Sequence, residues 1–263
     1  MSAVRPAWLI ARPIAHRGLH DRAQGVIENS VSAARQAIAG NYAIECDVQI
    51  SADGEAMVFH DATLERLCDE KGRVDAQSAA SLSRIALRGS DDAITPLPRF
   101  LELIGGRVPL IVEIKSEFAE DLKLAERTAC LAAAYNGPVA LKSFDPGIMA
   151  HLQKNRGTLG LSHIPLGMIA EAHFDHEEWN FLQPQEKHAL ANFLHWQDTQ
   201  PDFLSYHVND LPHAVPHLLR RAMGLPVMTW TVRSAEQRAR AEAWADQMVF
   251  EGWLPRGGKS SYP

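Results

Sequence analysis

Short apolar runs alternate with alanine-rich stretches along most of the chain. The runs are nearly continuous in apolar residues, which is typical of strands buried on both faces of a parallel sheet. They lie at 12–16, 42–50, 55–60, 108–115, 138–143, 158–163, 202–208, 226–232 and 246–252. The alanine-rich stretches predict helices at 31–40, 78–87, 122–135, 147–155, 212–223 and 234–245. Gly40 ends the first of these at a position that suits the residue following a helix.

The order of these elements predicts a (β/α)8 TIM barrel. The run at 55–60 follows the run at 42–50 after only four residues, which is hairpin spacing, so we treat it as a small β-hairpin insertion after the second strand. Eight strand–helix units then remain within one predicted domain, residues 1–263. The alternative is a doubly wound open sheet, but the turn HRGLHDRAQG after the first strand lacks the glycine-rich phosphate loop expected there.

Composition and charge narrow the class of protein. Of the 263 residues, 46% are hydrophobic and 22% are charged, as in ordinary globular proteins. The net charge of −6 argues against a nucleic-acid partner. Arginine and proline interrupt the first 18 residues, and no apolar run is long enough to span a bilayer. We therefore expect a cytoplasmic protein with no stable membrane anchor.

The three cysteines are widely spaced along the chain, at Cys46, Cys68 and Cys130. This spacing fits neither a disulfide framework nor a zinc site. We expect three reduced, buried thiols.

Carboxylates gather at the ends of two predicted barrel strands. Glu45 and Asp47 lie two residues apart, so their side chains share one face of a strand, whereas Cys46 points to the helices. Glu113 ends the next barrel strand within the apolar sequence PLIVEIK. Three carboxylates this close repel one another unless a cation neutralises them, and an oxygen-only site favours Mg²⁺ or Ca²⁺. The sequence thus predicts one divalent cation held by Glu45, Asp47 and Glu113.

Other polar residues at the same strand ends suit a phosphate group. Arg17 and Lys115 add positive charge beside the predicted metal, and arginine binds phosphate oxygens in a bidentate manner. His16 and His60 titrate near neutral pH, so one can accept a proton while the other donates one. These four residues predict phosphate binding and acid–base catalysis.

Five ordered motifs resemble those of the glycerophosphodiester phosphodiesterase family. They are His16-Arg17-Gly18, Glu28-Asn29, Glu45-Cys46-Asp47, His60-Asp61 and Glu113-Ile114-Lys115. The resemblance covers most of the chain and is densest over 14–116. It implies metal-dependent hydrolysis of a small-molecule glycerophosphodiester to glycerol 3-phosphate and an alcohol, with His16 and His60 as the acid–base pair.

Four residues receive supporting roles. We expect Glu28 to orient a metal ligand or Arg17, and Asp61 to orient His60 or shape the turn. Asn29 precedes the helix at 31–40 and is a good N-cap, which leaves support of the active site as its other role. Trp230, near the end of a strand, forms either an apolar wall against the substrate or part of the core.

Two stretches depart from the family pattern. The sequence VFEGWLP carries Glu251 where many members have an aspartate after the strand. The long segment 163–200, with Trp179, Phe181 and Trp196, aligns poorly, and we predict that it governs substrate choice unless it packs outside the barrel. Lysophospholipids, sugar phosphodiesters or a catalytically inactive phosphate-binding barrel are the alternatives. The assignment of acid and base, direct attack by water or a cyclic phosphate, and the oligomeric state are left open.

Overall fold

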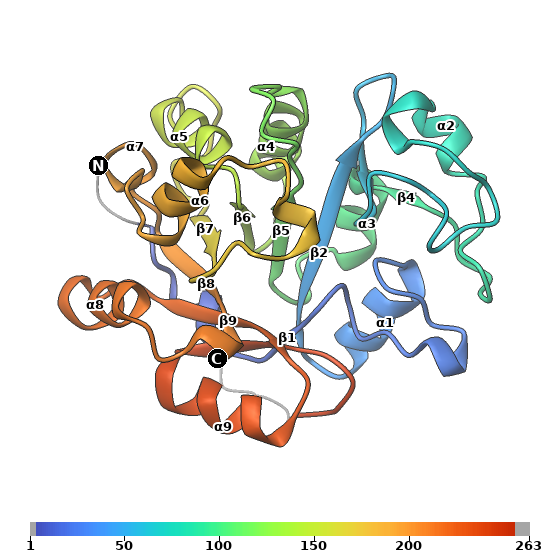
Figure 1. The fold of residues 1–263 in the computed structure, drawn as a ribbon. Coiled ribbons are helices and arrows are strands. Elements are labelled where there is room, and N and C mark those ends of the chain that lie inside the picture. Colours follow the sequence, from blue (N-terminus) through green and yellow to red (C-terminus); the bar gives the residue numbers. More distant parts are fainter. Residues whose placement is uncertain (1–3, 256–263) are drawn as a thin grey trace.

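The computed structural model describes residues 4–255, and eight of its strands form a closed parallel barrel (Figure 1). β1 pairs with both β2 and β10, which closes the sheet. In order around the barrel the strands are β1 (Ile14–Ala15), β2 (Ala43–Ile50), β5 (Leu110–Ile114), β6 (Val139–Ser143), β7 (Leu166–Ala170), β8 (Phe203–His207), β9 (Val227–Val232) and β10 (Gln247–Phe250). The predicted TIM barrel is confirmed.

Helices follow the strands and enclose the barrel. Their apolar faces pack on the outward side chains of the strands, which is the arrangement that buries both surfaces of a parallel sheet. The α-helices are α1 (Val31–Ala39), α2 (Ala79–Leu82), α3 (Leu97–Ile104), α4 (Lys123–Ala134), α5 (Pro146–Lys154), α6 (Pro184–Ala191), α7 (Trp196–Thr199), α8 (Ala214–Met223) and α9 (Ala235–Trp244). Short 3-10 helices are η1 (Ala7–Ile10), η2 (Arg22–Gln24), η3 (Val74–Ala76), η4 (Glu177–Trp179) and η5 (Val208–Asp210).

The barrel interior has an apolar floor below a polar layer. The floor is made of one cluster that includes Ile14, Ile111, Phe203, Met228 and Val249. Gly167 on β7 makes room for Phe203, since a Cβ there would lie 2.3 Å from the phenyl ring. Side chains alternate along strands, so the next inward positions lie nearer the carboxyl ends, where polar residues occur. This alternation raises the functional side chains above a packed floor.

The predicted hairpin insertion is present and extends beyond a simple hairpin. β3 (Ala56–Val58) runs antiparallel to the end of β2, with Val48 opposite Val58. β4 (Thr95–Pro96) then pairs antiparallel with β3. The chain between β3 and β4 contains α2 and a separate apolar cluster, and it projects to one side of the barrel (Figure 1). This excursion brings His60 to the barrel mouth.

One predicted strand is wrong. Residues 158–163 form turns after α5, and Gly160 has a φ of +73°, which does not suit a strand. The strand is β7, Leu166–Ala170, which lies inside the segment 163–200. The apolar sequence LGMIA is the better strand signal, and Gly160 and the polar ends of TLGLSH argue against the earlier position.

Some helix predictions also need correction. In the stretch 78–87 only Ala79–Leu82 is α-helical, and α3 in the sequence LPRFLELI was not predicted. Gly40 has a φ of −80°, so it is not the left-handed residue after α1; Asn41, with φ +58°, is. Position 40 favours glycine on steric grounds, because a Cβ there would lie 2.6 Å from the Tyr42 ring.

Two further predictions concern the cysteines and the membrane. Cys46 and Cys68 are buried as expected, whereas Cys130 on α4 is exposed.

Within residues 4–255 no helix is both long and apolar enough to cross a membrane.

Candidate active site

The three predicted carboxylates meet at the barrel mouth. Glu45 and Asp47 share the inner face of β2, and Asp47 is paired in register with Glu113 of β5. One carboxylate oxygen from each residue lies within 4.8 Å of the other two, and all three residues are buried. A buried group of oxygen donors this compact fits a hard divalent cation such as Mg²⁺ or Ca²⁺.

Two lysines lie against this cluster and offset part of its negative charge. Lys115 Nζ lies 2.8 Å from Asp47 Oδ1 and 2.5 Å from Glu113 Oε1. Lys142 Nζ lies 3.0 Å from Glu45 Oε1 and 3.4 Å from Glu113 Oε2. Burial by itself raises a carboxyl pKa, but these ammonium groups outweigh it and lower the pKa of Glu113. Lys142 is 3% exposed and was not predicted as a site residue. The feature of the sequence that could have identified it is its place near the end of a barrel strand.

Each of the two predicted catalytic histidines has a carboxylate on the same ring nitrogen. His16 Nδ1 lies 2.7 Å from Glu251 Oε2, and His60 Nδ1 lies 2.6 Å from Asp61 Oδ1. A carboxylate on Nδ1 places the proton there and leaves Nε2 for proton transfer. Glu251 follows β10 and was noticed in the sequence only as a departure from the family pattern.

Arg17 joins the carboxylate cluster to Glu28. Its Nη1 lies 2.6 Å from Glu28 Oε1, and its Nε lies 3.2 Å from Asp47 Oδ2. Its backbone N–H donates to Glu45 Oε2 at 3.1 Å, and its φ is +55°. Such a left-handed conformation is uncommon for a residue other than glycine and here turns the chain sharply after β1. The predicted contact between Glu28 and Arg17 is therefore present.

Asn29 does not cap α1. The cap is Ser30, whose hydroxyl accepts from the Ala33 N–H. Asn29 instead has a φ of +57°, and its Nδ2 donates to Asp47 Oδ2 at 2.9 Å while its Oδ1 accepts from the Asp47 N–H at 3.2 Å. The capping prediction is wrong because Ser30, and not Asn29, directly precedes the first helical residue, Val31, which frees the Asn29 amide to hold a carboxylate of the cluster.

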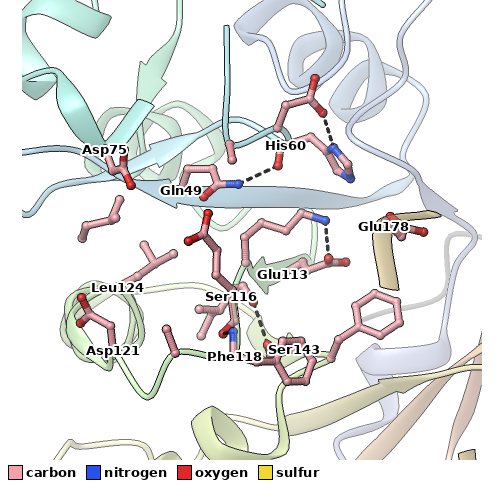
Figure 2. Close-up of a pocket in the computed structure, with 18 of the residues that line it drawn as sticks. Gln49, His60, Asp75, Glu113, Ser116, Phe118, Asp121, Leu124, Ser143 and Glu178 are labelled. Atoms are coloured by element: carbon pink, nitrogen blue, oxygen red, sulfur yellow. Dashed lines mark hydrogen bonds and ion pairs between the residues drawn. The ribbon is translucent and has the colours of Figure 1, made fainter. Parts of the chain in front are cut away.

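A cavity of about 480 Å³ lies beside Glu113, one of the three clustered carboxylates. His60, Glu113 and Lys115 line one part of it. We call its apolar side the aromatic wall, which consists of Phe118, Phe144, Trp179 and Phe181. Figure 2 shows His60, Glu113, Phe118 and Glu178 around this cavity.

The aromatic wall combines three parts of the chain. Phe118 follows β5, Phe144 follows β6, and Trp179 and Phe181 come from the segment 163–200. The Trp179 ring centroid lies 4.9 Å from that of Phe144 and 6.3 Å from that of Phe118. Trp196, by contrast, begins α7 and packs against the main apolar core. The segment therefore contributes both to the cavity and to the outer layer.

Two further residues near the aromatic wall, Trp230 and Glu171, do not line this cavity. Trp230 on β9 donates from Nε1 to the Ser205 carbonyl, and its ring centroid lies 5.0 Å from that of His207. Glu171 directly follows β7 and is 1% exposed. Burial raises the pKa of Glu171 to about 7, with Asp210 and Glu178 adding to the shift and His207 opposing it. Glu171 was not predicted at a strand end, because the strand was expected at 158–163 and lies at Leu166–Ala170.

The sequence and fold comparisons agree on one family. Residues 16–250 match the family model described as "Glycerophosphoryl diester phosphodiesterase family". A glycerophosphodiester phosphodiesterase of Caldanaerobacter subterraneus subsp. tengcongensis is 25% identical over 237 residues, which cover 86% of this chain and 88% of that protein.

Solved structures show the same fold. An Oleispira antarctica phosphodiesterase in complex with the product sn-glycerol-3-phosphate matches with a TM-score of 0.71 at 19% identity, covering 90% of this chain and 91% of that one. The glycerophosphodiester phosphodiesterase of Thermotoga maritima matches with a TM-score of 0.66 at 19% identity, covering 90% and 92%. With the family model spanning most of the chain, this protein belongs to the glycerophosphoryl diester phosphodiesterase family and is a phosphodiester hydrolase.

Proposed function

We propose that this protein hydrolyses glycerophosphodiesters to glycerol 3-phosphate and an alcohol, with the help of one divalent cation, Mg²⁺ or Ca²⁺. The observation that carries the proposal is the placement of two histidines, each with Nδ1 bonded to a carboxylate, beside a buried cluster of three carboxylates. The cluster suits a cation, and the histidines suit proton transfer. An inactive phosphate-binding barrel would not require both.

Glu45, Asp47 and Glu113 hold the cation in this proposal. When bound, the cation polarises a phosphoryl oxygen and lowers the pKa of a hydroxyl or water. Arg17 and Lys115 bind the phosphoryl oxygens and stabilise the charge that develops on them. Lys142 and Asn29 hold the carboxylates in place, since each contacts at least one of the three.

His16 and His60 carry the protons. One Nε2 accepts the proton of the attacking hydroxyl, and the other Nε2 donates a proton to the departing alcohol oxygen. Glu251 and Asp61 stabilise whichever imidazole is protonated and fix both rings. When water attacks directly, this step gives glycerol 3-phosphate. When the glycerol 2-hydroxyl attacks first, the step gives a cyclic phosphate, and a water then opens the ring with the two histidines in exchanged roles.

The aromatic wall offers an apolar surface to the alcohol group of the substrate, and Trp230 is proposed as a further apolar contact at the mouth. The cavity lies beside His60 and Lys115, so a diester held by its phosphate can extend one end along Phe118 and Trp179. We propose that the chain acts as one barrel domain on small-molecule substrates in the cytoplasm.

The decisive assay is turnover of a panel of glycerophosphodiesters, lysophospholipids and sugar phosphodiesters, with and without a chelator. We expect chelator-sensitive release of glycerol 3-phosphate. His16→Ala and His60→Ala then distinguish acid from base across a series of leaving alcohols, because loss of the acid matters least with the best leaving group. Absence of turnover with every diester, at saturating Mg²⁺ and Ca²⁺, would overturn the proposal.

A further inference from the structure

Arg66 forms four hydrogen bonds to two carboxylates at the edge of the active site. Its Nε and Nη2 donate to Asp61 Oδ2 and Oδ1, at 2.5 and 3.0 Å. Its Nη1 and Nη2 donate to Glu28 Oε2 and Oε1, at 2.9 and 2.8 Å. The planar guanidinium thus makes a bidentate contact with each carboxylate, and Nη2 donates to both of them.

Each of these carboxylates also holds a residue of the proposed catalytic machinery. Asp61 Oδ1 lies 2.6 Å from His60 Nδ1, and Glu28 Oε1 lies 2.6 Å from Arg17 Nη1. Arg66 is therefore the link between the proposed acid–base side and the proposed phosphate-binding side. The five residues form a continuous chain of alternating partners across the mouth.

The local fold holds the Arg66 backbone in place. Leu64 and Leu67 on either side are buried in the apolar cluster of the insertion. The Leu64 N–H donates to the Gly72 carbonyl, and the Leu67 N–H donates to the Leu64 carbonyl. The Arg66 side chain itself is 43% exposed, so its position depends on the two carboxylates rather than on packing.

The charges of the carboxylates reflect the same contacts. Burial raises the pKa of Glu28, but hydrogen bonds from Arg66 and Arg17 outweigh it and lower that pKa to about 2. Hydrogen bonds from His60 and Arg66 likewise outweigh burial and lower the pKa of Asp61. Both carboxylates are ionised at neutral pH and available to orient their partners.

We propose that Arg66 is a positioning residue that fixes His60 and Arg17 relative to each other, through Asp61 and Glu28. The inference rests on the proposed function, because it assigns the consequences to binding and turnover of the same diester. This positioning role requires the planar guanidinium group of an arginine. A lysine ammonium is a point charge and cannot reproduce four bonds to two carboxylates.

The experiment measures two quantities in the metal-loaded protein. Affinity for sn-glycerol 3-phosphate by calorimetry reports the Arg17 side, and kcat for an alkyl glycerophosphodiester reports the His60 side. Glu28→Gln is expected to weaken mainly the affinity, and Asp61→Asn to lower mainly kcat. Arg66→Gln is expected to do both, each by about 10-fold, the scale typical of losing a residue that orients a functional group.

Arg84→Gln is the matched control. Arg84 lies in the same insertion, is exposed and is not part of the chain of contacts at the mouth, so both quantities should be unchanged. Arg66→Lys should have a melting temperature close to that of the wild type, but its kcat should lie between the values for Arg66→Gln and the wild type. The proposal is overturned if Arg66→Gln folds and changes neither quantity, or if Arg66→Lys equals the wild type in both. If Arg66→Gln does not fold, Arg66→Lys alone decides.

Failure of the proposed function would look different. A wild-type protein that turns over no diester contradicts that function, but its affinity for sn-glycerol 3-phosphate still tests Arg66. An Arg66→Gln protein that binds this ligand as the wild type does would then overturn the positioning role.

Discussion

Glu251 and His16 are separated by 235 positions in the sequence, yet Glu251 Oε2 lies 2.7 Å from His16 Nδ1. They follow β10 and β1, which are neighbours where the barrel closes. Hydrogen bonds from His16 and Arg233 outweigh burial and lower the pKa of Glu251, so this carboxylate is ionised at neutral pH. The contact between Glu251 and His16 is equivalent to the contact between Asp61 and His60. It shows that a glutamate at position 251 is long enough to reach the imidazole.

Replacement of Glu251 tests this relationship. Glu251→Gln removes the charge that stabilises a protonated His16 and weakens control of its tautomer, so we expect kcat to fall by about 10-fold or more. Steady-state kinetics measure the loss. Glu242→Gln, an exposed glutamate paired with Arg238 on α9, is the control and should match the wild type. An unchanged kcat for Glu251→Gln would remove Glu251 from any role in catalysis.

The carboxylate cluster predicts a requirement for a divalent cation. Chelation should abolish turnover, and Mg²⁺ or Ca²⁺ should restore it. Glu45→Gln and Glu113→Gln should each weaken metal affinity by at least about 10-fold, because each removes a charged ligand while keeping its shape. Isothermal titration with each metal measures this, with the exposed Glu102→Gln as control. Wild-type affinity in both cluster variants would show that the ligands are wrong.

Arg17→Lys should not behave as a conservative change. Arg17 contacts both Glu28 and Asp47, and a lysine cannot keep both contacts while binding phosphate oxygens. We expect kcat/KM to fall by about 10-fold or more, measured on one glycerophosphodiester under metal saturation. If kcat/KM is unchanged and only the melting temperature falls, Arg17 is structural.

The aromatic wall should control which alcohol is preferred. Phe181 is 51% exposed and lines the cavity, so Phe181→Ala should change relative kcat/KM values across bulky and small alcohol groups by a few-fold with little loss of stability. Leu194→Ala is the control, because Leu194 is 64% exposed in the same segment but does not line the cavity. A loss by one common factor for all substrates would contradict a role in specificity.

Glu171 should make stability depend on pH. Its folded-state pKa of about 7 lies above the usual 4.5, so the folded protein keeps a proton that the unfolded chain releases. Stability contributed by this group therefore falls as pH rises from about 4.5 to about 7. Glu171→Gln lacks this titration and should be more stable than the wild type at pH 8, by about 1–3 kcal/mol.

Denaturant unfolding at pH 5 and pH 8 measures the effect of Glu171. The gain of Glu171→Gln over the wild type should be larger at pH 8. The exposed Glu177→Gln in the same segment is the control and should show no such difference. Equal gains at both pH values would mean that Glu171 does not titrate in this range.

Local periodicity made much of this protein predictable. The order of apolar runs and helical stretches predicted the barrel, because each unit forms by the same strand–helix packing. The two-residue period placed Glu45 and Asp47 on one face and Cys46 on the other, and neighbouring strands brought Glu113 beside them. Adjacent residues in the chain also account for His60 and Asp61.

The remaining contacts depended on how distant segments meet. Closure of the barrel brought Glu251 to His16, and the inner face of β6 brought Lys142 to Glu45. The left-handed turn at Asn29 aimed its amide at Asp47, and the insertion carried Arg66 to Glu28. Periodicity determines which face of a strand or helix a side chain occupies, but its partner is selected by packing between elements far apart in sequence, and only the folded barrel decides that.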